Sequence, residues 1–210
     1  LPAPPPDWNW DDMRAYVQKT VQTDENARVI RPGIVLPVRW DRLGVLLNHA
    51  DTRWLNDVRK PTATNLLTDQ VLQTMRYVGE LWFIGAHNSG SQFYRGNAAL
   101  FTAAATNAGV QIANALGGDR FAFGWQRYPR GPGRNTGVEL EYQVYGVFAE
   151  SEYHEAAWQW IKFLTQRADT QLSMASHTDR VPAYQPAGAQ FLRDMRDDYP
   201  SIEIFIDLWF

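Results

Sequence analysis

The clearest change of hydrophobic period along the chain falls between Gly137 and Leu164. From Val138 to Tyr145, apolar and polar side chains alternate as they do in a β-strand. From Ala156 to Leu164, apolar residues instead recur at the spacing of an amphipathic helix. Ser151 is a suitable N-cap for that helix, because its hydroxyl can accept a hydrogen bond from an open N–H group of the first turn. The pattern predicts a strand that leads through a short turn into a helix.

The same two periods predict the other elements of the chain. Asn9 is a suitable N-cap for the first helix, and Gly117 and Gly118 are suitable to end a helix before them. The stretch 127–137 is rich in Pro and Gly and is predicted to be an exposed loop. Helical spacing predicts helices over about residues 10–21, 40–47, 68–85, 107–116, 168–176, 187–198 and 202–210. Short β-branched or aromatic runs predict strands at 28–38, 99–102 and 121–125.

Composition places the chain among ordinary globular proteins. Its 210 residues are 45% hydrophobic and 20% charged, which is typical of a soluble fold of one or two lobes. A net charge of -3 gives no support to a nucleic-acid surface. The chain has no Cys, which excludes disulfides, thiolate metal sites and cysteine nucleophiles. It begins LPAPPPDW, without an initiator Met or a signal sequence, and a Pro-rich start of this kind is expected of a fragment or an excised domain.

Aromatic residues are the unusual feature of the composition. Nine Trp, nine Tyr and ten Phe can serve core packing, and they can also build a site that stacks flat ligands or sugars. Glu139 and Glu141 share one face of the strand predicted from Val138 to Tyr145. They can form a general acid/base pair, a solvated sheet edge, or a cleft in which a carboxylate accepts hydrogen bonds from ligand hydroxyl groups.

Motifs for other chemistry are absent from the sequence. The HEAAW segment that begins at His154 lacks the second histidine of a zinc-protease helix, and the histidines lie far apart without metal-ligand spacing. Neither a phosphate-binding loop nor the turn that carries a nucleophilic serine occurs. Arg127, Arg130 and Arg134 make a small basic loop, for which a solvated turn is the simplest interpretation.

Read in order, five segments resemble the family 1 extracellular solute-binding proteins, the sugar-type receptors of ABC importers. PPPDWNWDDMRAYV resembles the helix start found midway through that family, and FYRGNAALF resembles its segment in which a helix passes into a strand. FAFGWQRYPRGPGRN is similar to its strand-then-loop segment. VYGVFAESEYHEAAWQWIKFLTQ resembles its helical unit rich in Ala and aromatic residues, and RVPAYQPA resembles a family turn that contains proline.

The resemblance implies the fold of type II periplasmic binding proteins, an α/β fold in which two lobes hold ligand between them. The chain would be a truncated, helix-rich lobe with a small mixed sheet. Residues 1–135 would form the core of the second lobe, 136–181 a crossover segment belonging to the first lobe, and 182–210 a return to the second lobe. Such proteins have no catalytic residues and no cofactor, and they close on ligand and present it to a membrane permease. The full-length form would be a periplasmic or extracellular lipoprotein.

The resemblance also suggests which residues contact the ligand. Trp40 matches an aromatic position of the family, and Thr106 and Asn107 stand where a second aromatic residue is usual. The segment ELEYQVYG replaces the family's glycine-rich ligand loop, so Glu139, Glu141 and Tyr142 would point toward the cleft. The implied ligand is a small polar molecule such as a saccharide or polyol.

Two other interpretations remain open. The chain can be a carbohydrate-active enzyme domain that uses Glu139 or Glu141 as its catalytic carboxylate. It can also be a purely structural helical domain.

A lone lobe exposes the apolar face that its partner lobe would cover, and we therefore expect self-association of this chain.

Overall fold

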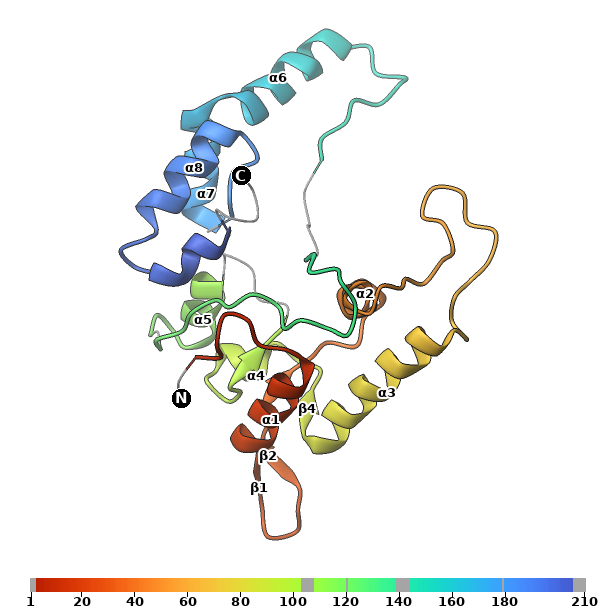
Figure 1. Cartoon of the computed structure of the whole chain (residues 1–210). Helices are drawn as coiled ribbons and strands as arrows, with labels where there is room; N and C mark the ends of the chain where they lie inside the picture. The colour runs from red at the N-terminus through yellow and green to blue at the C-terminus, as the bar shows by residue number, and fades with distance from the viewer. Residues whose placement is uncertain (1–2, 103–107, 120, 139–143, 179, 206–210) are drawn as a thin grey trace. The chain divides into compact units, whose positions relative to one another are not determined.

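The computed structural model describes residues 3–102, 108–119, 121–138, 144–178 and 180–205 (Figure 1). The chain divides into two compact units. Unit 1 combines Leu1–Ala103 with Gln126–Leu140, and unit 2 combines Ala104–Trp125 with Glu141–Phe210. Each unit has a hydrophobic cluster of its own.

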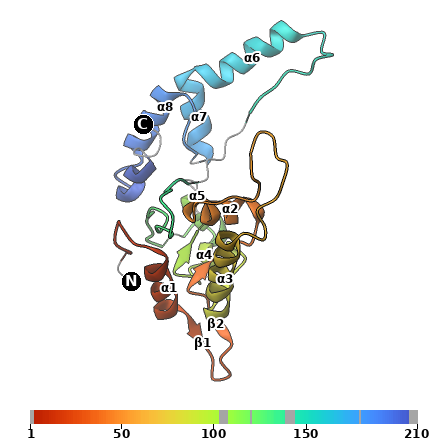
Figure 2. The ribbon, with the colours of Figure 1, turned by 45° about the vertical axis from the view of Figure 1, so that its right-hand side comes forward.

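Unit 1 is built around a small parallel sheet with the strand order β4–β3–β5. Ile34 of the central strand is paired with Ala86 on one side and with Leu100 on the other. Strands β1 and β2 form a separate antiparallel ribbon, which extends from the end of α1 in Figures 1 and 2. In chain order the elements are α1 (Trp10–Thr20), β1 (Gln22–Thr23), β2 (Val29–Arg31), β3 (Ile34–Val35), α2 (Trp40–His49), α3 (Asp69–Ile84), β4 (Ala86–His87), α4 (Ser91–Tyr94) and β5 (Leu100–Phe101).

Helix α1 begins with a capping box. The Asn9 side chain accepts hydrogen bonds from the backbone N–H groups of Asp11 and Asp12, and the Asp12 carboxylate accepts one from the Asn9 N–H. One face of the helix buries Met13 and Val17 completely. The N-cap prediction for Asn9 is confirmed.

The core of unit 1 lies between α1, α2, α3 and the sheet. Trp10 stacks on Tyr77 of α3 with ring centroids 4.4 Å apart, and the Tyr77 hydroxyl donates a hydrogen bond of 2.8 Å to the Trp10 carbonyl oxygen. Burial raises the pKa of Tyr77, which therefore stays a neutral donor. The other buried members of this core include Trp8, Ile34, Leu36, Leu43, Leu46, Val78 and Leu81.

Unit 2 consists of helices and a cluster of aromatic side chains. Its core contains Phe191, Leu192 and Ile202, and Trp125 and Tyr199 pack against it. The ring centroids of Trp125 and Tyr199 lie 5.3 Å apart. No residue of helix α6 is buried. In chain order the elements are α5 (Ala108–Ala115), α6 (His154–Gln166), α7 (Ala168–Thr178), α8 (Gln185–Asp194) and the 3₁₀ turn η1 (Pro200–Ile202).

Most of the predicted helices are present, whereas several strand predictions are wrong or incomplete. The strand predicted at 28–38 is two strands, β2 and β3, separated by Pro32 and Gly33. The run 121–125 is not a strand, because its aromatic side chains pack on Tyr199 and the Trp125 N–H donates to the Ser201 hydroxyl instead of to a neighbouring strand. Strands β1 and β4 were not predicted.

The strand and helix predicted between Gly137 and Leu164 need separate corrections. Residues 139–143 of the predicted strand lie outside the described part of the chain, and the described flanks at Val138, Val144 and Tyr145 are not in a strand. Helix α6 is present, but Ser151 is not its N-cap. The helix begins after Tyr153, and the Ser151 hydroxyl accepts a hydrogen bond from the Tyr153 N–H in the preceding turn. The assignment of residue ranges to two lobes stays a prediction.

Candidate functional site

The carboxyl ends of the three parallel strands of unit 1 meet at one edge of the sheet. In open parallel sheets, ligands bind beyond this edge. They bind between two neighbouring strands whose following connections leave toward opposite sides of the sheet. The order β4–β3–β5 places that point between β3 and β5. The segment after β3 runs from Leu36 to Trp40, and Thr102 follows β5.

Trp40 is the first residue of α2 and ends the segment that follows β3. Its side chain is 77% exposed, which is unusual for the largest apolar residue. Its carbonyl oxygen accepts a hydrogen bond of 2.9 Å from the Trp54 indole N–H, which fixes the backbone. The arrangement leaves a flat aromatic face open at a fixed place.

The loop after β4 lies beside the loop after β3. The Leu36 N–H donates to the His87 carbonyl oxygen at 2.9 Å, and the Val38 N–H donates to Asn88 Oδ1 at 2.8 Å. Val38, Asn88 and Ser89 are all exposed. We refer to Val38, Trp40, Asn88 and Ser89 as the sheet-edge site.

An ion pair borders this site. The Arg39 guanidinium binds Asp41 with two hydrogen bonds, of 3.1 and 2.7 Å. Burial alone would raise the pKa of Asp41, but the backbone N–H groups of Arg42 and Asp41 and the Arg39 guanidinium together hold that pKa below its usual value. Asp41 is therefore a charged carboxylate at neutral pH.

Of the residues predicted to contact ligand, the structure describes Trp40. Thr106, Asn107, Glu139, Glu141 and Tyr142 lie outside the described residues, so their roles remain predictions. The sequence places Thr106 and Asn107 shortly after β5, the neighbour of the strand that leads to Trp40.

The segment that leads to Glu139 is tied to the end of α2. His49 is 1% exposed, and its ring nitrogens lie 3.0 Å from the Pro129 carbonyl oxygen and 2.7 Å from the Gly137 carbonyl oxygen. The Asp51 carboxylate accepts hydrogen bonds from the Arg134 and Asn135 N–H groups. The predicted exposed loop is thus anchored at several points to the end of α2 and to Asp51 just after it.

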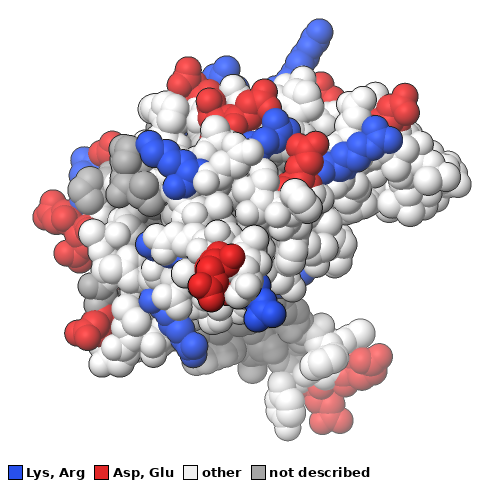
Figure 3. Space-filling model, turned by 90° about the horizontal axis from the view of Figure 1, so that it is seen from below, with Lys and Arg blue, Asp and Glu red and all other residues white. Residues whose placement is uncertain are grey.

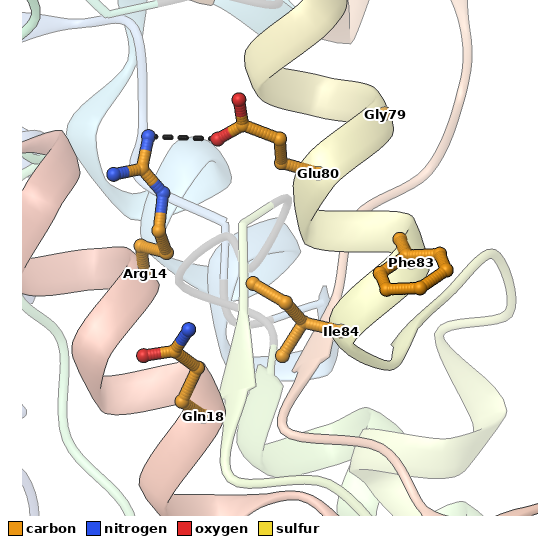
Figure 4. Close-up of a pocket in the computed structure, with 6 residues that line it drawn as sticks. All are labelled: Arg14, Gln18, Gly79, Glu80, Phe83 and Ile84. Carbon is orange, nitrogen blue, oxygen red and sulfur yellow. Dashed lines mark ion pairs between the residues drawn. The ribbon is translucent and has the colours of Figure 1, made fainter.

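Away from the sheet-edge site, a hollow lies between α1 and α3 (Figure 4). Arg14 of α1 forms an ion pair of 2.8 Å with Glu80 of α3, and Phe83 beside it is 94% exposed. Gln18, Gly79 and Ile84 complete the lining. Trp40, the described member of the predicted ligand contacts, does not line this hollow. An ion pair this exposed adds little to stability.

The surface gives no sign of a basic patch on the face shown in Figure 3, where Lys and Arg side chains are interspersed with Asp and Glu. Within the described residues, no cluster of three or more His, Asp or Glu side chains is arranged to hold a metal ion. No described helix has both the length and the apolar character needed to span a bilayer.

Sequence reasoning did not identify Val38, Asn88 and Ser89. The HNSGS segment is readable as a loop, but its position depends on the parallel pairing of β3 with β4. A hydrophobic pattern does not report pairing between strands that are distant in sequence.

Comparison with known proteins identifies the fold. No protein-family model and no curated protein matches the sequence. Among solved structures, the chain is similar to the ABC substrate-binding protein Lmo0181 from Listeria monocytogenes, solved in complex with cycloalternan. The TM-score is 0.72, with 16% identity, over 99% of this chain and 53% of that one. It is also similar to the maltose/maltodextrin-binding domain MalE from Bdellovibrio bacteriovorus, bound to maltotriose. Here the TM-score is 0.73, with 20% identity, over 100% of this chain and 55% of that one.

These matches confirm the predicted fold class. The parallel and antiparallel strand pairs, expected in one small mixed sheet, lie in separate sheets. The chain spans about half the length of the solved structures that it matches. It has the helix-rich α/β fold of part of an ABC sugar-binding protein.

Proposed function

We propose that this chain is part of the solute-binding component of an ABC importer, and that it binds a saccharide or polyol in a cleft and delivers it to a membrane permease. The main support is the fold, which matches two ABC substrate-binding proteins over nearly all of this chain. Both of those proteins were solved with oligosaccharides. On this proposal the protein works outside the cytoplasmic membrane, with a lipid anchor in its full-length form.

The exposed indole of Trp40 supports a sugar ligand. A pyranose ring presents apolar C–H faces, which pack well on a flat aromatic surface. Its hydroxyl groups both donate and accept hydrogen bonds, so Ser89 at the same edge can pair with them. Thr106, Asn107, Glu139, Glu141 and Tyr142 are proposed to complete the site, with the carboxylates accepting hydrogen bonds from hydroxyl donors.

In this proposal the protein binds its ligand without changing it. The enzyme alternative requires turnover by Glu139 or Glu141, and chromogenic glycosides test it directly. Release of the chromophore that is abolished by Glu139→Gln or Glu141→Gln would reject the binding-protein proposal.

A thermal-shift screen against sugars, polyols, amino acids and peptides tests the ligand class. A ligand that binds only the folded state at one hundred times its Kd stabilises it by about 2.7 kcal/mol. We expect weak but selective stabilisation by saccharides, because this chain covers about half of the matched fold. A response to amino acids or peptides alone would reject the saccharide, and no response at any concentration would count against the solute-binding role.

The Trp40→Ala variant tests the assigned contact. Loss of one stacking surface should weaken saccharide binding by about 1–3 kcal/mol, by analogy with base–aromatic stacking. Isothermal titration of both proteins measures the difference. Trp158→Ala is the matched control, because Trp158 is 50% exposed on α6 of unit 2. Unchanged binding by Trp40→Ala would remove Trp40 from the site.

A further inference from the structure

The β3–β4 pairing continues for one hydrogen bond beyond the end of β3. Leu36 donates its N–H to the His87 carbonyl oxygen, as expected in a parallel ladder. Pro37 has no N–H, so the next donor of this segment is Val38. That N–H donates at 2.8 Å to Asn88 Oδ1, a side chain that takes the place of a backbone carbonyl.

This hydrogen bond fixes the orientation of the Asn88 amide. A backbone N–H can only donate, so the side-chain atom facing Val38 must be the oxygen. Because the bond joins residues fifty positions apart, it connects the loop after β3 directly to the loop after β4.

Trp40 depends on this connection for its position. It follows Val38 by two residues, and its indole is 77% exposed, so side-chain packing does little to hold it. Its direction is set by the backbone, which is held before Trp40 by Asn88 and at Trp40 itself by the Trp54 indole N–H.

We propose that Asn88 is a positioning residue for the sheet-edge site: its side chain holds the loop at Val38 and so fixes the direction in which Trp40 presents its indole. The role in ligand binding rests on the proposed function, whereas the positioning itself does not.

NMR of the full 210-residue chain tests the positioning without any ligand. In Asn88→Ala, we expect exchange of the Val38 amide to be about fivefold faster, as loss of a hydrogen bond of roughly 1 kcal/mol implies. The Trp40 indole N–H signal, which is identified by its absence from the spectrum of Trp40→Phe, should shift or broaden. Asn88→Asp should restore both, because a carboxylate oxygen also accepts from the Val38 N–H.

Asp24→Ala is the matched control. Asp24 Oδ1 accepts hydrogen bonds from the Asn26 and Arg28 N–H groups in the turn between β1 and β2, so its loss loosens a loop by the same mechanism. The control should leave the Trp40 signal unchanged. An unchanged Val38 exchange rate or an unchanged Trp40 signal in Asn88→Ala would overturn the proposal.

Titration with maltotriose as the probe tests the consequence for binding. We expect Asn88→Ala to weaken binding by about three- to tenfold and Asn88→Asp to recover it. Equal binding by Asn88→Ala and the unaltered chain would overturn the role in binding. If the unaltered chain does not bind maltotriose or any other saccharide, the proposed function fails, and the NMR results still decide whether Asn88 positions Trp40.

Discussion

At the scale of single residues, one close approach of two backbones lies where β3 passes α1. A Cβ atom on Gly33 would lie 2.6 Å from the Val17 carbonyl oxygen and 2.9 Å from the Thr20 hydroxyl. Both neighbours belong to a fully packed helix face and cannot withdraw. Glycine is therefore needed here for space.

Gly33→Ala is expected to lower the free energy of unfolding by about 1–3 kcal/mol, the usual cost of adding a methyl group to a packed core. Gly79→Ala is the matched control, because nothing lies within 4 Å of a Cβ atom at that position of α3. It should stabilise the chain by about 0.5–1 kcal/mol, since alanine favours a helix over glycine. Urea unfolding measures both. Equal effects of the two variants would contradict the close contact.

Asp169 gives a prediction about pH. Hydrogen bonds from the Arg167 guanidinium and the Thr170 N–H lower the pKa of Asp169 from 3.8 to about 2. The ionised form is the one that these groups bind, so the stabilisation is fully present above about pH 4 and is lost as the pH falls toward 2. Asp169→Asn should reduce the acid dependence of stability in this range.

Thermal unfolding at a series of pH values measures the Asp169 effect. The stability difference between Asp169→Asn and the unaltered chain should shrink between pH 4 and pH 2. Arg167→Gln should weaken the same dependence, because it removes the guanidinium. A difference that stays constant across this range would show that the pair does not couple to folding.

Hydrogen bonds between residues that are close in sequence could be predicted, and those between distant residues could not. Asn9 was predictable as an N-cap because its hydrogen-bond partners Asp11 and Asp12 lie within three residues of it. Asn88 makes an equally short hydrogen bond, but its partner is fifty residues away. Ser151 shows a limit even for local signals, since its hydroxyl accepts from the Tyr153 N–H in a turn that precedes the observed helix start at His154.

At the scale of elements, helices were predicted better than strands. A helix repeats its apolar stripe over several turns, whereas β3, β4 and β5 are two residues long and carry no period. The aromatic run 121–125 has the composition of a strand, but its side chains find partners in Tyr199 and Phe205 of unit 2. Composition alone does not decide between strand pairing and aromatic packing.

His49 links two elements, and its removal should release one of them. His49→Ala leaves the Pro129 and Gly137 carbonyl oxygens without their ring partner, and we expect a loss of about 1–3 kcal/mol in unfolding free energy. Limited proteolysis with trypsin should cut faster after Arg130 and Arg134, because the loop that carries them is less firmly held.

His177→Ala is the control for this experiment, since His177 is exposed at the end of α7. It should change neither the unfolding free energy nor the rate of cleavage after Arg130. If the two histidine variants behave alike, the buried contacts of His49 do not anchor the loop.

At the scale of the whole molecule, periodicity did not predict the strand order β4–β3–β5. The order of the segments that resemble the family did predict the fold. A resemblance to known proteins includes information about which distant strands pair, and hydrophobic patterns do not contain that information. Of the predicted ligand contacts, Trp40 lies at the sheet edge expected for such a site, and the other five fall outside the described residues.

The exposed aromatic face of α6 predicts self-association of this chain. Trp160 is 59% exposed and stacks on Phe163, with ring centroids 5.3 Å apart. Apolar faces of this kind bind one another, and a buried Trp commonly dominates the contact. Sedimentation velocity should show dimers or larger species as the concentration rises. Trp160→Gln should weaken the association by about tenfold.

Trp82→Gln is the control for self-association, because Trp82 is 37% exposed on α3 of unit 1. It should leave the sedimentation profile unchanged. A strict monomer at high concentration, or an equal effect of the two tryptophan variants, would argue against association through α6.

The central position of β3 bears on how unit 1 folds. Its partners Ala86 and Leu100 are both far along the chain, so neither strand pair can form from a local hairpin. Closing such long loops costs chain entropy before any stabilising contact forms. This cost makes folding slow. During synthesis on the ribosome, β3 emerges before β4 and β5. Both of its edges therefore stay unpaired until those two strands have been synthesised. During that interval its apolar residues Ile34, Val35 and Leu36, which the finished fold buries, are exposed and prone to aggregation.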